Sequence, residues 1–181
     1  MKLWFVDDLR PLTNRMNWNK NALDILLERK EYCECTSPLG MESGDIANSQ
    51  ITVSSKGPYA PGRYARLRYN GRWRPALNDV NGWIKIELLH NYTLTGIIVQ
   101  GWDGWTKTLS ISYEMPPRSG TLVNIHDEQG QPQIFQASTD GHTPVNIVFD
   151  HPIYSSIIQV EPKTCKDDGQ YCALRLEILG C

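Results

Sequence analysis

The sequence predicts an all-β domain, either a sandwich or a barrel, on two observations. Short segments that are rich in β-branched residues, or that alternate apolar with polar residues, follow one another from residue 51 onward, separated by Gly, Pro, Asn and Asp. With 181 residues, 40% of them hydrophobic and 21% charged, the chain has enough apolar side chains for one globular domain with a core. Many short strands joined by turns are typical of sandwiches and barrels.

The predicted strands differ in how clearly their residues alternate. In the second of them Ile84, Ile86 and Leu88 alternate with Lys85 and Glu87, which turns one apolar face toward a core. Residues 94–99 form the longest apolar run, which has the length of a buried strand. The eight predicted strands are residues 51–55, 82–89, 94–101, 108–114, 132–137, 145–150, 155–162 and 172–179.

A helical pattern precedes the strands. Leu23, Leu26 and Leu27 have the spacing of one helix face, with charged residues between them, so residues 21–31 are predicted to form a short amphipathic helix. A linker helix or a poorly ordered leader is the alternative. The chain therefore divides into an N-terminal extension with a short helix, residues 1–34, and a β domain, residues 35–181.

Residues 56–81 form the longest irregular segment, and segments of this length in compact domains tend to be binding loops. Arginines interleave here with aromatic residues, a combination that suits anionic or sugar-bearing ligands through forked hydrogen bonds and ring stacking. The alternative is that the arginines only pair with Asp79, Glu87 or Glu177. The residues in question are Tyr59, Tyr64, Tyr69, Trp73, Arg63, Arg66, Arg68, Arg72 and Arg74.

Charge and motifs exclude several classes of function. The chain has 18 basic and 20 acidic residues, without the basic excess of nucleic-acid binders, and no apolar run has the length of a membrane span. The four histidines are dispersed, the acidic pair Asp127 and Glu128 sits in a polar turn, and no catalytic or metal-binding motif is present. We therefore expect no enzyme activity, no cofactor and no metal.

The cysteines indicate an oxidising compartment. Cys33, Cys35, Cys165, Cys172 and Cys181 lack the spacing and the accompanying histidines of a zinc site, so they are expected to form disulfides. The sequon at Asn91 predicts a glycan in a water-facing turn between two strands. Asp7 and Asp8 interrupt the apolar start of the chain, so no signal peptide is expected. These features predict a fragment of a larger secreted or membrane-anchored protein, or an incomplete gene model.

Six motifs follow one another between Cys35 and Cys181. They are "CTSPLGMESGDIANSQITVSS", "ARLRYNGRWRPALNDVNGWIKIELL", "LTGIIVQG", "WTKTLSISYE", "HDEQGQPQIFQASTDGHTPVNIVFDHPI" and "ALRLEILGC". In this order they resemble the coagulation factor V/VIII type C domain, also called the discoidin domain. The resemblance implies an eight-stranded jelly-roll-like β-sandwich closed by a disulfide between Cys35 and Cys181. We also expect a disulfide between Cys165 and Cys172, with Cys33 unpaired or bonded to another chain.

The resemblance further implies a ligand surface on three loops, called spikes, at one end of the sandwich: residues 56–63, 69–72 and 101–106. Trp105 lies where the family has a Trp that leads into a strand, so it is expected to pack beneath its loop, whereas Trp102 is expected to be an exposed indole. The third spike is short, which disfavours deep insertion into a membrane. The expected ligand-binding residues are Tyr59, Arg63, Tyr69, Arg72, Trp102 and Asp103.

The family is non-enzymatic, and its members bind phosphatidylserine membranes, collagen, glycans or other receptors. The resemblance therefore implies an extracellular adhesion or recognition module whose partner is a cell-surface glycan, an anionic phospholipid or an extracellular matrix protein. The His/Arg/Asp arrangement of the fucose-binding relatives is not found. The alternative is a structural or self-associating module of a larger matrix protein.

Overall fold

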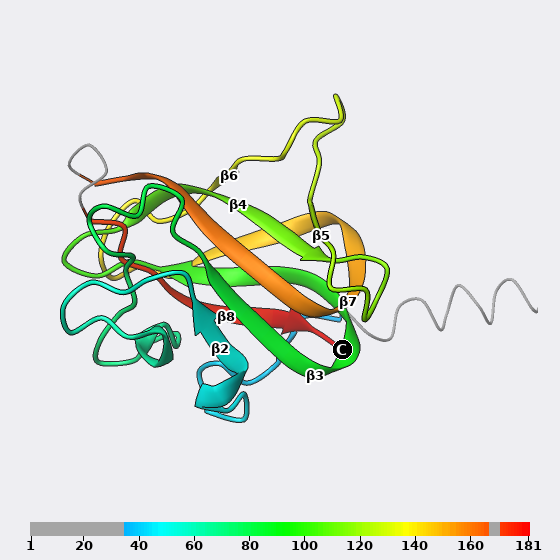
Figure 1. The fold of residues 1–181 in the computed structure, drawn as a ribbon, viewed down its shortest axis with the longest axis horizontal. Coiled ribbons are helices and arrows are strands. Elements are labelled where there is room, and N and C mark those ends of the chain that lie inside the picture. Colours follow the sequence, from blue (N-terminus) through cyan, green and yellow to red (C-terminus); the bar gives the residue numbers. More distant parts are fainter. Residues whose placement is uncertain (1–34, 167–170) are drawn as a thin grey trace, which may run out of the picture. The chain divides into compact units, whose positions relative to one another are not determined.

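Two long, bent strands organise the fold (Figure 1). They are β3 (Ile84–Gln100) and β7 (Val145–Cys165), which pair with each other along both of their halves. The other strands join them directly or through β4 (Thr106–Glu114) and β8 (Arg175–Gly180). This computed structural model describes residues 35–166 and 171–181, so the predicted helix at residues 21–31 and Cys33 lie outside the described residues.

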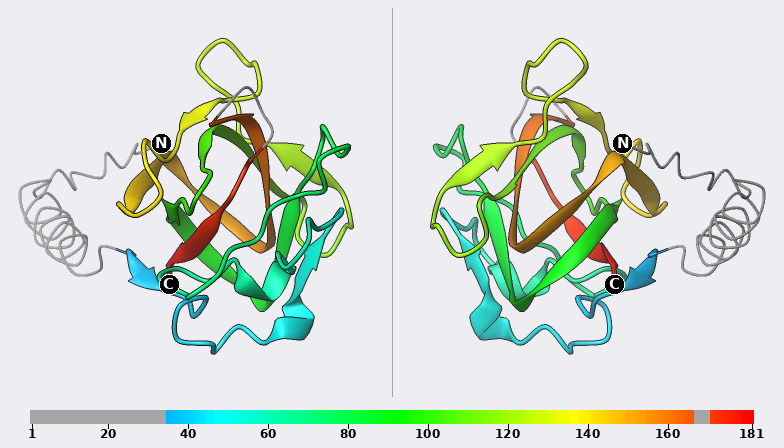
Figure 2. Two further views of the ribbon diagram at one scale, coloured as in Figure 1. Left: turned by 90° about the vertical axis from the view of Figure 1, so that its left-hand side faces the viewer. Right: turned by 90° about the vertical axis from the view of Figure 1, so that its right-hand side faces the viewer.

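The bends turn one continuous antiparallel sheet into the two layers of a sandwich. The first half of β3 pairs with the second half of β7 and with β2 (Ile51–Val53), and β7 continues this layer through β4 to β5 (Leu122–Asn124). The second half of β3 pairs with the first half of β7 and with β8, which carries β1 (Ser37–Pro38). The short β6 (Phe135–Gln136) pairs with β4. Figure 2 views the strands from the two ends of the domain.

Irregularities in strand pairing produce these bends. The register of β3 against β7 shifts between Glu87 and Tyr92 and again between Leu94 and Gly96. Leu89 has a positive φ of 55° within the first irregularity. Such bulges bend a strand without ending it.

Eight strands were predicted and eight are observed, but two pairs of predicted strands are each a single strand in the structure. Residues 82–89 and 94–101 belong to the single strand β3, and residues 145–150 and 155–162 to the single strand β7. Between these predicted strands the pairing is irregular, and a sequence pattern does not distinguish such bulges from turns. Two observed strands, β1 and β5, were not predicted, because the sequence around them contains Ser, Pro, Gly and Asn, which indicate loops.

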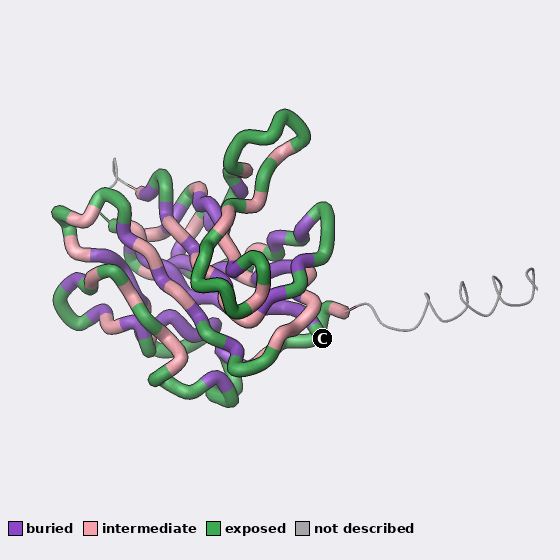
Figure 3. The backbone as a smooth tube through the Cα atoms, turned by 45° about the vertical axis from the view of Figure 1, so that its right-hand side comes forward, coloured by how far each residue is buried: buried purple, intermediate pink, exposed green. Residues whose placement is uncertain are grey.

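The core lies between the two layers. Ile84, Ile86 and Leu88 are buried there, which confirms the predicted apolar face. Trp73 is completely buried in the same cluster and donates its indole N–H to the carbonyl of Ser55 at 3.0 Å. It is therefore a core residue and not part of the ligand surface. Figure 3 shows the buried residues concentrated in the strands and the exposed residues in the loops.

Two disulfides fasten the domain. Cys35 is bonded to Cys181 across a sequence separation of 146 residues, and Cys165 is bonded to Cys172. Close to the first disulfide, Ser37 pairs with Gly180, so β1 and β8 hold the two ends of the β domain side by side. Residues 35–181 form one compact unit.

Candidate functional site

Three loops gather at the end of the sandwich that lies opposite the Cys35–Cys181 disulfide, on the left in Figure 1. The first is residues 56–63, which leads into the short 3₁₀ helix Gly62–Tyr64. The second is residues 69–72, and the third is residues 101–106, which connects the end of β3 to the start of β4. Gln100 pairs with Arg175 and Thr106 pairs with Cys165, so the start of β8 and the end of β7 lie at this end too. We call these three segments the spike loops.

The side chain of Arg175 ties the spike loops together. It is only 4% exposed, and its Nη1 donates to the carbonyl of Tyr69 at 2.9 Å. Its Nε and Nη2 donate to the carbonyl of Gly101 at 3.0 and 2.6 Å, and Nη2 also donates to the carbonyl of Gly141 at 3.1 Å. Burial lowers the pKa of this guanidinium. One cation thus fixes the second spike loop, the third spike loop and the 138–144 loop relative to each other.

The same guanidinium covers one face of an indole. The Cζ atom of Arg175 lies 4.7 Å from the ring centroid of Trp102, a cation–π contact. Trp102 is half-buried, and so is Trp105, whose ring carries the ammonium of Lys166 at 4.7 Å. The expected division between an exposed Trp102 and a packed Trp105 is therefore wrong. Each indole is covered on one face by a cation, and both indoles are half-buried.

The loop of residues 138–144 packs against the third spike loop. The carboxylate of Asp140 accepts the backbone N–H groups of Thr143 and His142 at 2.6 and 2.7 Å. These bonds and the hydroxyl of Thr143 lower the pKa of Asp140. Gly141 packs directly on the backbone of Trp102, where a Cβ atom would overlap the Trp102 carbonyl. The turn of the third spike loop closes with the N–H of Trp102 donating to the carbonyl of Gly104 at 2.9 Å.

Stacked side chains connect the first two spike loops. The guanidinium of Arg63 lies 4.8 Å from the ring centroid of Tyr64, and the rings of Tyr64 and Tyr69 are 5.1 Å apart. Tyr59, in the first spike loop, is 90% exposed and has a positive φ of 55°. The structure thus links Arg63, Tyr69 and Trp102 through stacking and through Arg175, while Tyr59 stands clear in solvent.

Arg72 and Asp103, from two different spike loops, line one small pocket of about 240 Å³. The rest of its lining is Arg74, Gly104, Tyr171 and Ala173. Only glycine fits at position 104, because a Cβ atom there would overlap the Cβ of Tyr171 and lie 2.6 Å from its carbonyl oxygen. We call this cavity the spike pocket.

The spike pocket contains a buried cation, two atoms of which have no hydrogen-bond partner among the described residues. Arg74 is 9% exposed, and its Nε and Nη1 atoms are covered by protein and have no hydrogen-bond partner in residues 35–166 and 171–181. Its guanidinium packs on Gly57, where a Cβ atom would lie 2.7 Å from Cζ, and it faces the ring of Tyr171 at 5.4 Å. A buried charge without a partner is costly, and an anion or a hydrogen-bond acceptor from a ligand would offset that cost.

The arginines of residues 56–81 do not pair with the acids considered as their alternative partners. Asp79 accepts the hydroxyls of Ser54 and Ser55, and the pKa of Asp79 is lowered by these bonds. Glu87 contacts Lys85 at 3.2 Å. The buried carboxylate of Glu177 accepts the backbone N–H groups of four residues, which are Gly40, Met41, Glu42 and Ile178.

Two of these arginines have structural roles of another kind. Arg66 is buried and donates to the carbonyls of Met41 and Ile46 at 2.8 and 2.7 Å. Arg68 pairs with Glu42 at 2.6 Å on the surface. Arg63, Arg72 and Arg74 remain near the spike loops.

The sequence did not point to Arg175 or Tyr171 as residues of this site, and it did not distinguish Arg74 from the other arginines. Arg175 was not singled out, although an arginine between Leu174 and Leu176 in an apolar strand is an unusual placement that signals a buried polar contact. Tyr171 carried no signal of its own. Arg74 was one of five arginines, and nothing in the sequence distinguished it from its neighbours.

The described residues contain no group of three or more His, Cys, Asp or Glu side chains that could hold a metal ion. No helix within the described part of the chain is long and apolar enough to cross a membrane.

Comparisons with known proteins agree on the type of domain. The family model described as "F5/8 type C domain" matches residues 50–178. Coagulation factor V of Bos taurus is 36% identical over 185 residues, which covers 91% of this chain and 8% of that protein. The human EGF-like repeat and discoidin I-like domain-containing protein 3 is 31% identical over 166 residues, covering 82% of this chain and 33% of that protein. The chain thus spans a third or less of these relatives' length.

Solved structures share the fold at low sequence identity. Wild-type discoidin II from Dictyostelium discoideum superposes with a TM-score of 0.60 at 21% identity, over 72% of this chain and 53% of that one. The CpGH89CBM32-5 module from Clostridium perfringens, solved with GalNAc-β-1,3-galactose, has a TM-score of 0.60 at 12% identity. It covers 80% of this chain and all of its own.

Proposed function

Because the chain belongs to the F5/8 type C domain family, we propose that it is an extracellular, non-catalytic recognition module that binds its ligand with the spike loops. The ligand classes that fit are a cell-surface glycan, an anionic phospholipid head group and an extracellular matrix protein such as collagen. The observation that carries the proposal is the spike pocket. There Arg72 and Asp103 from separate loops meet Arg74, whose Nε and Nη1 have no hydrogen-bond partner among the described residues.

The chemistry of the spike pocket suits a polar ligand group next to a flat apolar one. A guanidinium presents a planar fork of donors that matches carboxylate, sulfate or phosphate oxygens and sugar hydroxyls. Asp103 supplies an acceptor, and Tyr171 supplies a ring face beside the guanidinium of Arg74. The neighbouring stack of Arg63, Tyr64 and Tyr69 extends the surface with aromatic rings. A sugar ligand is also supported by the C. perfringens module with this fold, which was solved with GalNAc-β-1,3-galactose.

Exposed apolar side chains at the same end support the second candidate, self-association. Tyr59, Leu77 and Val80 are 90%, 64% and 85% exposed, and the loops that carry them both start near Ser55. In a larger matrix protein these tips would pack against another copy of the domain. Size-exclusion chromatography separates the two candidates, since a recognition module binds its ligand as a monomer.

The pocket variant Arg74→Gln tests the recognition proposal. Binding of the wild type is screened on phosphatidylserine vesicles, on collagen and on a glycan array, and the variant is then compared on each surface that binds. We expect binding to weaken by about tenfold or more, because a hydrogen bond to a charged group contributes about 1.5–3 kcal/mol.

The matched control is Arg68→Gln, which removes an exposed arginine that pairs with Glu42 outside the spike pocket. This control should leave binding within about twofold of the wild type, because Arg68 does not line the spike pocket. Equal losses in both variants would assign the effect to overall charge. If Arg74→Gln binds as the wild type does, the spike pocket is not the ligand site.

Asn91 is the proposed glycosylation site, at the end of the domain away from the spike loops. It lies within β3 at the first register irregularity and is half-buried. Its Oδ1 atom is covered and accepts no hydrogen bond from any residue that the structure describes. The expected water-facing turn is thus a bend inside one strand. We expect intact-mass measurement of protein from a eukaryotic secretion host to show a glycan that the Asn91→Gln variant lacks. Equal masses, after the substitution is allowed for, would show that the sequon is unused.

A further inference from the structure

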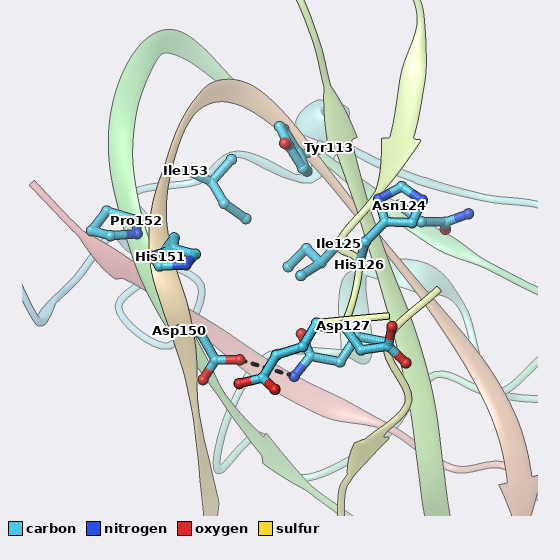
Figure 4. Close-up of a pocket in the computed structure, with 11 residues that line it drawn as sticks. Tyr113, Asn124, Ile125, His126, Asp127, Asp150, His151, Pro152 and Ile153 are labelled. Atoms are coloured by element: carbon cyan, nitrogen blue, oxygen red, sulfur yellow. Dashed lines mark hydrogen bonds between the residues drawn. The ribbon is translucent and has the colours of Figure 1, made fainter. Parts of the chain in front are cut away.

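The sandwich is open along one side, where the edge strands of its two layers face each other. One layer ends at β5, which in the described part of the chain pairs only with β4. The other layer ends at the first half of β7, because β7 pairs with β4 only from Ile158 onward. A cleft of about 580 Å³ lies between these two edges (Figure 4), and it has no lining residue in common with the spike pocket.

The lining of this cleft, which we call the edge cleft, combines an apolar floor with an acidic rim. Tyr113, Ile125 and Ile153 form the apolar part, and Ile153 is buried. Asp127, Glu128 and Asp150 supply three carboxylates, and no lysine or arginine is among the described lining residues. The other polar lining residues are Asn124, His126, Gln133 and His151. Figure 4 labels Asn124 and the two histidines. The edge cleft thus has the opposite charge to the spike pocket.

The carboxylates come from two elements that project into the cleft from either side. Asp127 lies in the hairpin that follows β5, where its Oδ1 accepts the N–H groups of Gln129 and Gln131 at 3.0 and 2.8 Å. Asp150 lies in an irregular part of β7, since β7 adds residues 149–152 where β3 has only Thr95. Its Oδ2 accepts the amide of Gln133 at 3.3 Å across the cleft (Figure 4). Within the described part of the chain, Asp127 Oδ2, Asp150 Oδ1 and the Glu128 carboxylate accept no hydrogen bond.

We propose that the edge cleft binds an extended basic segment of a partner protein, which pairs with the free edge of β5. An exposed strand edge offers unpaired backbone groups, so an extended peptide can add to it as a further strand. Side chains of such a strand alternate between two faces, which directs every second residue into the cleft. Lysine or arginine at those positions would meet the carboxylates, while their aliphatic stems cover Ile125 and Ile153.

The probe for this site is a capped, fluorescein-labelled peptide of seven residues in which lysine and valine alternate. Its binding is followed by fluorescence anisotropy at pH 7.5 and low salt, beside a peptide of alternating glutamate and valine. We expect the lysine peptide to bind at least about tenfold more tightly, with an affinity that falls as salt is added, because salt screens exposed charges. A glutamate peptide that binds equally well would overturn the proposal.

Substitutions in the edge cleft test whether the lysine peptide binds there. Glu128→Gln combined with Asp150→Asn should weaken binding of the lysine peptide by about fivefold or more, as expected for the loss of two facing charges. The matched control is Glu87→Gln combined with Glu161→Gln, which removes two carboxylates that contact Lys85 and Lys163 on the surface. That control, and Arg74→Gln in the spike pocket, should leave binding within about twofold. If the control weakens binding as much as the cleft variant, the peptide is not bound in the edge cleft.

Two further measurements test the fold and the strand pairing. Thermal unfolding shows whether the cleft variant is folded, and Glu128→Gln alone serves if it is not, because that carboxylate makes no hydrogen bond within the described residues. A lysine peptide with a central proline cannot donate a backbone N–H at that position, so it should bind several-fold more weakly. Unchanged binding of the proline peptide would refute the pairing with β5. A dimer of the free domain that buries the cleft would refute the proposed occupant.

Discussion

Replacement of Cys35 and Cys181 by alanine is expected to lower the free energy of unfolding by about 5 kcal/mol, the value that chain entropy gives for a loop of more than 100 residues. The disulfide closes a loop with a sequence separation of 146 residues. In the folded domain the pairing of Ser37 with Gly180 already holds the two ends together. The lost bond therefore acts mainly by giving the unfolded chain more freedom.

The second disulfide provides the comparison. Cys165 and Cys172 are only 7 residues apart, so their replacement by alanine should cost about 2.5 kcal/mol by the same argument. For a domain of this size 1 kcal/mol corresponds to about 2–4 °C, so the first variant should melt roughly 10–20 °C below the wild type. Equal shifts in the two variants would show that loop length does not set the stabilisation. Thermal unfolding followed by circular dichroism measures both shifts.

Alternation of apolar and polar residues was sufficient to place most of the sheet. The buried face of Ile84, Ile86 and Leu88 follows from the two-residue period of a strand. The alternation does not show, however, that β3 and β7 are each one uninterrupted strand. A stretch such as residues 90–93 has the composition of a turn, and only pairing with a neighbouring strand shows that the backbone continues through it.

The location of the candidate site could be predicted only through the resemblance to a known family. Nothing in the local sequence states that residues 56–63, 69–72 and 101–106 meet at one end. The resemblance named the loops, and the structure adds the side chains that fix them. Contacts such as those of Arg175 join residues more than 70 positions apart, so a local pattern cannot reveal them.

The two half-buried indoles show why exposure was harder to predict than position. A Trp beside Asp-Gly is expected at a loop tip, and Trp102 does lie in such a turn. Its exposure is reduced by Arg175, a residue 73 positions later that places a cation over the ring. Burial of an aromatic loop residue thus depends on a partner that the loop's own sequence does not contain.

Arg74 and Arg175 both have a buried guanidinium group, but they differ in hydrogen bonding. We therefore expect them to have opposite effects on the stability of the domain. Arg175 makes four hydrogen bonds to the carbonyls of Tyr69, Gly101 and Gly141. Two nitrogens of Arg74 have no hydrogen-bond partner within the part of the chain that the structure describes. A buried polar group that is satisfied stabilises the fold, whereas an unsatisfied one costs free energy. Arg175 therefore holds the spike loops together, whereas Arg74 makes the ligand contact only in the proposed function.

Arg175→Met is consequently expected to destabilise the domain by about 3 kcal/mol or more, because it leaves three loop carbonyls without donors at about 1–3 kcal/mol each. Loss of the cation should also uncover the indole of Trp102 and change the tryptophan fluorescence. Arg74→Met, the matched control, removes an unpaired cation of the same size and should leave the melting temperature unchanged or raise it. Ligand binding should fall in both variants, for different reasons. If Arg74→Met is the more destabilising of the two, then the hydrogen bonds of Arg175 do not fix the spike loops.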